Sequence, residues 1–91
     1  MKKQYKICGW LKPIKVNGQL YSQIVEIPRF TDPAYACTYG EKLMKAGVFI
    51  GFTVRFFDEE AKDWFRVHEK YCKMPDKELI AKTRPFCLIV N

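Results

Sequence analysis

The fold is decided by residues 4–27, which read QYKICGWLKPIKVNGQLYSQIVEI. Two stretches rich in β-branched, aromatic and aliphatic side chains flank the dipeptide Asn17-Gly18, and this pattern is typical of a β-hairpin. Asn and Gly both tolerate the positive φ that a two-residue type I′ turn requires. The sequence therefore predicts two antiparallel strands joined at Asn17-Gly18.

A two-residue loop also predicts the register of the hairpin, because it sets which residues lie opposite each other. The expected pairs are Val16 with Gln19, Lys12 with Gln23, Leu11 with Ile24, and Trp10 with Val25. One face, expected to be the core face, then carries Tyr5, Ile7, Leu11, Leu20 and Ile24. The other face is mixed and is a candidate binding surface; it carries Lys6, Cys8, Trp10, Lys12, Gln23, Val25 and Ile27. Pro13 has no amide hydrogen, so it suits an edge, a bulge or the end of a strand.

Helix and strand signals follow the hairpin. Pro28 ends the second arm, and a helix is expected over 32–46 with Asp32 as N-cap and Gly47 just beyond its end. One stripe of this helix has side chains at helical spacing and consists of Tyr35, Tyr39, Leu43 and Ala46. The segment 48–57 is rich in β-branched and aromatic residues and predicts a strand.

The second half of the chain is predicted to form a helix followed by a strand. A helix is expected over 58–73, capped by Asp58, because apolar side chains recur there at helical spacing. Asp76 is a candidate cap for a short further helix. The apolar run 86–90 predicts a buried strand.

These elements predict a single α+β domain spanning residues 1–91, in the order β-β-α-β-α-β. The expected architecture is a small mixed sheet of about four strands, including one parallel pair, with two helices packed on one face.

Composition agrees with a folded domain: hydrophobic residues make up 48% and charged residues 29% of the chain. A disordered chain is less apolar, and a membrane span needs about 20 apolar residues in a row. The formal charge of +6 is uneven, since residues 1–46 contain eight basic and three acidic side chains. The four cysteines form no Cys-x-x-Cys pair and no secretion signal is apparent, so we expect reduced thiols in a cytoplasmic protein.

Catalytic chemistry finds little support. His68 and Cys72 lie four residues apart on the expected helix, where a dyad or two metal ligands would be possible, with Cys8 or Cys87 added from the sheet. A buried pair that fills the core explains the same spacing. Of the acidic cluster at residues 58–63, helix capping explains Asp58, Glu59 and Glu60 without any acid–base chemistry. We therefore expect a protein that is not an enzyme and that has no cofactor and no metal.

Binding is the expected function, and the candidate residues are aromatic or basic. They are Lys6, Trp10, Lys12, Tyr21, Arg55 and Phe57. A protein partner or self-association as a homodimer is the first hypothesis, because exposed aromatics anchor interfaces and an edge strand can add another strand. The alternative is single-stranded nucleic acid, with Trp10 stacking on bases and the basic side chains meeting phosphates. We expect no membrane association.

Overall fold

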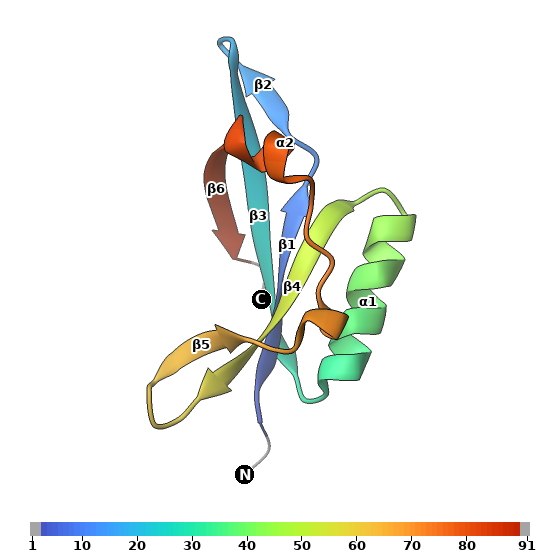
Figure 1. Cartoon of the computed structure of the whole chain (residues 1–91), viewed down its shortest axis with the longest axis vertical. Coiled ribbons are helices and arrows are strands. Elements are labelled where there is room, and N and C mark those ends of the chain that lie inside the picture. Colours follow the sequence, from blue (N-terminus) through green and yellow to red (C-terminus); the bar gives the residue numbers. More distant parts are fainter. Residues whose placement is uncertain (1–2, 90–91) are drawn as a thin grey trace.

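The computed structural model describes residues 3–89, with side chains as far as residue 84 (Figure 1). Its strands are β1 (Tyr5–Leu11), β2 (Ile14–Val16), β3 (Gln19–Phe30), β4 (Phe49–Asp58), β5 (Asp63–Arg66) and β6 (Arg84–Ile89). Its helices are α1 (Pro33–Lys45), the 3-10 turn η1 (Glu69–Tyr71) and α2 (Lys77–Ala81). The expected small α+β domain is confirmed. Val90, the last residue of the expected C-terminal strand, lies outside the described residues.

The sheet has more strands than the sequence predicted, and its order differs. Five strands follow the antiparallel order β2-β3-β1-β4-β5, and β6 adds in parallel to β3. β3 is the spine of the sheet: its residues pair with β1 and β2 along one edge and with β6 along the other. Figure 1 shows this long strand running along much of the molecule from the β2–β3 turn at the top. The β4–β5 hairpin curls away at the other end of the molecule.

The turn of the hairpin and the pair next to it are as predicted, but the register farther along the hairpin is not. Asn17 and Gly18 have φ values of 50° and 81°, and Val16 pairs with Gln19. Lys12 and Pro13 then separate β1 from β2, and beyond them Trp10 lies opposite Ile24.

The slip by one residue exchanges the two faces of the second arm, because side chains alternate along a strand. The expected grouping of Val25 and Ile27 with Trp10 was wrong. Ile24 and Glu26 share the face of Trp10, whereas Val25 and Ile27 share the face of Ile7.

Helix α1 forms where expected and packs on the face that carries Ile7. The Asp32 carboxylate accepts a hydrogen bond from the backbone amide of Ala34 at 3.0 Å, as an N-cap does. Close packing comes from Gly40, because a Cβ there would lie 2.7 Å from the ring of Phe52, which is fully buried.

Because of this contact, the face of α1 that packs on the sheet is not the expected stripe that contains the tyrosines. The buried residues of the helix are Ala36, Cys37 and Gly40. Tyr35 and Tyr39 are exposed and pack against Phe30. Their ring centroids lie 6.0 and 5.5 Å, respectively, from the centroid of the Phe30 ring.

The helix expected over 58–73 is wrong, because this segment forms a turn, β5 and η1. The Asp58 carboxylate does accept hydrogen bonds from the next backbone amides, as a helix cap would, but Lys62 adopts a φ of 53° and reverses the chain. The aromatic residues that suggested a helical stripe instead make cross-strand pairs, Trp64 with Phe57 and Phe65 with Phe56. Cross-strand aromatic pairs stabilise a hairpin directly.

The chain after β5 stays at the edge of β4. Lys73 makes two backbone hydrogen bonds with Phe52. Pro75 then lies where a side chain of Gly51 would point, which is the face opposite to that of Phe52. Asp76 caps α2, as predicted. The expected pair of long helices on one face is therefore replaced by α1 alone, which packs against β4, β1 and β3.

No helix among the described residues is both long and apolar enough to cross a membrane.

Candidate functional site

The face of the sheet opposite α1, called the front face here, carries a line of basic residues. Arg66 lies directly opposite Arg55, and Arg55 lies directly opposite Lys6. These three residues, the basic row, come from β5, β4 and β1. Neighbouring strands lie about 4.8 Å apart, and like charges placed directly opposite destabilise a sheet. A negatively charged ligand would reduce the repulsion within the basic row.

Lys6 already has an acidic partner. Its Nζ lies 2.9 Å from Oε1 of Glu26, and the two side chains are 12% and 25% exposed. The same ammonium group lies 4.5 Å from the centre of the Trp64 ring, a cation–π contact. Glu26 also lies 3.8 Å from the Sγ atom of Cys8. Lys6 therefore connects a carboxylate on β3 with an aromatic ring on β5.

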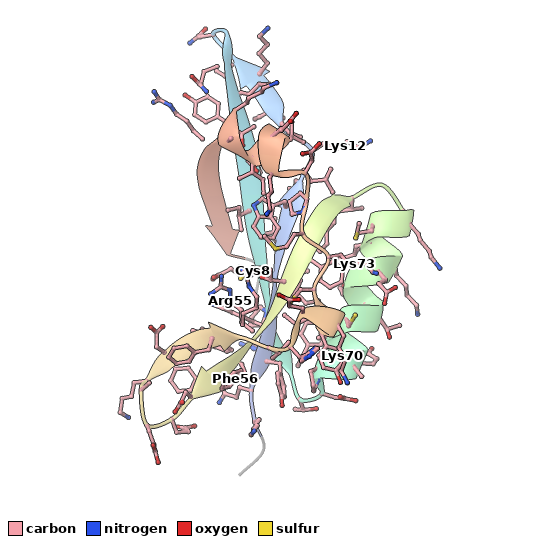
Figure 2. All side chains as sticks on the ribbon, viewed as in Figure 1. Cys8, Lys12, Arg55, Phe56, Lys70 and Lys73 are labelled. Atoms are coloured by element: carbon pink, nitrogen blue, oxygen red, sulfur yellow. The ribbon has the colours of Figure 1, made fainter. Side chains whose placement is uncertain are left out.

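Arg55 and Arg66 make no ion pair with any other described residue. Arg66 is exposed, and Arg55 is half-buried with its Nε atom shielded from solvent and without a hydrogen-bond partner in the described structure. A buried donor that lacks an acceptor costs about 1–3 kcal/mol. Figure 2 shows Arg55 beside Cys8 on the neighbouring strand, in the middle of the sheet.

Two aromatic residues border the basic row. Phe57 and Trp64 lie opposite each other on β4 and β5, with ring centroids 5.3 Å apart at an angle of 64°. Because side chains alternate along each strand, both rings share the front face with Arg55 and Arg66. Positive charge and aromatic surface therefore meet there.

Acidic residues limit this surface on one side. Asp58 pairs with Asp63 where the β4–β5 hairpin ends, and Glu59 and Glu60 lie in its turn. Their charge would repel an anion placed over the turn. A bound anion is therefore directed along the basic row toward β1 and β3.

The structure brings together half of the residues that the sequence selected. Lys6, Arg55 and Phe57 lie on neighbouring strands of the front face. Trp10 shares this face but lies farther along β1, opposite Gly51.

The other two selected residues lie away from the basic row. Lys12 is exposed between β1 and β2. Tyr21 lies at the protruding end of the hairpin, where it lines a hollow of about 320 Å³ with Ile14, Val16 and Gln23.

Sequence reasoning missed Trp64, Arg66 and Glu26. The first two were assigned to a helix, and the segment Asp63 to Arg66 has no apolar–polar alternation that would have indicated a strand. Glu26 was expected on the other face because of the register slip. The detectable signal was a turn at residues 59–62 between two aromatic pairs.

His68 and Cys72 do not form the buried pair that the sequence favoured, because the helix expected to carry them is absent. His68 is exposed, and its Nδ1 accepts a hydrogen bond from the backbone amide of Lys70 at 3.1 Å, so it caps η1. Within the residues that the structure describes, no three side chains of His, Cys, Asp or Glu gather as metal ligands would. The side chain of Cys87 lies outside this description.

The environment of Cys37 on α1 makes its thiol a poor nucleophile. Its side chain is 7% exposed, and its Sγ atom lies 3.4 Å from Oε1 of Glu41. Burial, followed by the hydrogen bond and the charge of Glu41, raises the pKa of the Cys37 thiol above its ordinary value. A thiol that stays protonated is a poor nucleophile.

No model of a known protein family matches this chain, and no curated protein or solved structure is similar enough to be matched to it.

Proposed function

We propose that this protein binds single-stranded nucleic acid across the front face of its sheet. The observation that carries this proposal is the basic row of Arg66, Arg55 and Lys6 beside the aromatic pair of Phe57 and Trp64. Proteins that bind single strands combine a basic track for the phosphates with aromatic rings on which bases stack. The row would supply the track, and the aromatic pair would supply the rings.

A single strand suits this surface better than a duplex. Its bases are free to turn toward aromatic side chains, whereas duplex bases already stack on each other. The acidic turn of residues 58–63 would also repel the second strand of a wide duplex. The proposed binding mode is thus a short single strand that crosses β5, β4 and β1.

A salt series with matched variants tests the proposal. Fluorescence anisotropy of a labelled mixed-sequence oligonucleotide would be measured with the wild type, Arg66→Ala and Lys42→Ala. Lys42 is exposed on α1, which packs on the other face, so its variant removes the same charge away from the row. We expect affinity to fall steeply with salt. Arg66→Ala should weaken binding and reduce the slope of log K against log salt by about 0.7, the value for one phosphate contact on a single strand.

Two results would oppose this function. One is binding weaker than about micromolar even at low salt, since non-specific electrostatic binding alone reaches that range. The other is an equal loss for Arg66→Ala and Lys42→Ala, which would reflect net charge without a site. Lys12→Ala is a second control, because a loss confined to this variant would move the site to the hairpin.

Protein binding is the second candidate, and the protruding end of the hairpin favours it. Ile14 and Val16 are 43% and 46% exposed and line the hollow that includes Tyr21. Exposed apolar residues beside an open strand edge suit self-association. Light scattering over a range of concentrations tests this, with Val16→Thr as a variant of nearly equal shape. A monomeric mass at every concentration would exclude the homodimer.

A further inference from the structure

A second hollow lies beside the basic row, where β1 begins and β3 ends. Its volume is about 510 Å³, within the range of sites that hold small molecules. Residues from three parts of the chain line it: Gln4, Pro28, Arg29, Phe30, Thr31 and Trp64. Two aromatic residues, one cation and two polar residues therefore border the same space.

Arg29 is held at this hollow by an irregular backbone. Its φ of 76° is in the left-handed region, which costs a residue other than glycine about 1–3 kcal/mol. The pairing of β1 with β3 shifts here, so that Pro28 and Arg29 together face Lys6. Arg29 is exposed and makes no ion pair with any described residue. The bulge thus places an uncompensated cation next to the end of the basic row.

Trp64 forms a prearranged wall of this hollow. Phe57 contacts the Trp64 ring at a centroid distance of 5.3 Å, and the ammonium of Lys6 lies 4.5 Å from its centre. Contacts from two other strands therefore hold the indole where it lines the hollow. An aromatic ring that is already ordered loses little entropy when a base stacks on it.

We propose that this hollow binds one nucleotide, with its base against Trp64 and its phosphate at Arg29. This inference rests on the proposed function and adds a defined subsite to it. Stacking on an indole and a charge-assisted hydrogen bond to a guanidinium are the two contacts that a nucleotide needs. Gln4 and Thr31 supply a side-chain amide and a hydroxyl that can meet the base edge or the sugar. Lys6, opposite the bulge, links the subsite to the rest of the bound strand.

Tryptophan fluorescence can read this subsite directly. The chain contains two tryptophans, so Trp10→Phe leaves Trp64 as the reporter. Adenosine 5′-monophosphate, adenosine and inorganic phosphate are the probes. We expect the monophosphate to quench Trp64 at lower concentrations than adenosine does, and phosphate alone to quench it little. Arg29→Ala should weaken binding of the monophosphate about tenfold, and Arg29→Lys should weaken it less.

Arg29→Gly separates a binding role from a structural one. Glycine adopts a positive φ without strain, so this variant removes the cation and relieves the backbone. We expect it to melt no lower than the wild type and to lose nucleotide affinity as Arg29→Ala does. Monophosphate affinity that is unchanged in both variants would overturn the subsite. If the oligonucleotide still binds with the expected salt dependence, the proposed function stands without it; if no oligonucleotide binds, the proposed function fails first.

Discussion

The contact between Gly40 and Phe52 holds α1 against the back of the strand that carries Arg55, and Gly40→Ala tests it. A Cβ at Gly40 would lie 2.7–2.8 Å from three atoms of the Phe52 ring. The ring is fully buried in the core cluster that also contains Ile7 and Val54, so it has little room to move. Alanine improves helix propensity by about 0.8–1 kcal/mol, whereas overpacking costs about 1–3 kcal/mol.

The net effect of Gly40→Ala should be a loss of about 1 kcal/mol in the free energy of unfolding. For a domain of this size that lowers Tm by about 4–8 °C. Urea denaturation followed by circular dichroism measures the change. The control is Thr38→Ala on the exposed side of the same helix. It should be close to neutral, because the gain in helix propensity offsets the loss of the hydrogen bond that the Thr38 hydroxyl donates to the Ala34 carbonyl at 3.0 Å.

A double variant distinguishes the clash from a change in the helix itself. Phe52→Leu removes the ring atoms that the new methyl group would meet, so Gly40→Ala should cost less in that background. A Gly40→Ala protein more stable than the wild type by about 0.8–1 kcal/mol, the full gain in helix propensity, would refute the close approach of α1 to β4.

Further predictions concern charge, capping and a buried thiol. Glu26→Gln should release Lys6, and oligonucleotide binding should tighten and become steeper in salt by about 0.7 in the log–log slope; an unchanged slope would show that Lys6 meets no phosphate. Asp32→Ala should lower the free energy of unfolding by about 1 kcal/mol in urea, and Asp32→Asn should recover most of it. The pKa of Cys37 is raised by burial and then by Glu41, so the folded state keeps a proton that the unfolded state loses above the ordinary pKa of 9.0. Stability should therefore fall as pH rises above that value, and Cys37→Ala should flatten the fall; parallel curves for the two proteins would exclude this contribution.

Local signals in the sequence predicted the parts of the fold that depend on few residues. Asn17-Gly18 predicted the turn, Asp32 predicted the start of α1, and the β-branched run predicted β4. Each of these features needs only a backbone preference or one hydrogen bond. The sequence showed that Pro13 suits a bulge. It did not show where the extra residue would be inserted, because that position depends on the pairing with the partner strands.

The second half shows where local signals compete. Asp58 hydrogen-bonds the following amides equally well at a helix start and in the turn that it makes here. Trp64 and Phe65 also fit a helical stripe. They form β5 instead because they pair with Phe57 and Phe56 across the turn. The basic row depends on the same pairing, because Arg66 reaches Arg55 only as a strand. Half of the candidate site therefore could not be predicted without tertiary contacts.

The parallel pairing of β6 with β3 has a consequence for the order of folding. β1, β2 and β3 form a local meander, whereas β6 must return across most of the chain to meet Tyr21 to Glu26. Contacts between distant residues close large loops and form slowly. The outer edge of β3 therefore remains unpaired in the interval before β6 docks, and an unpaired edge is a template for strands of other molecules. The yield of refolded protein should thus depend on concentration most strongly during that interval.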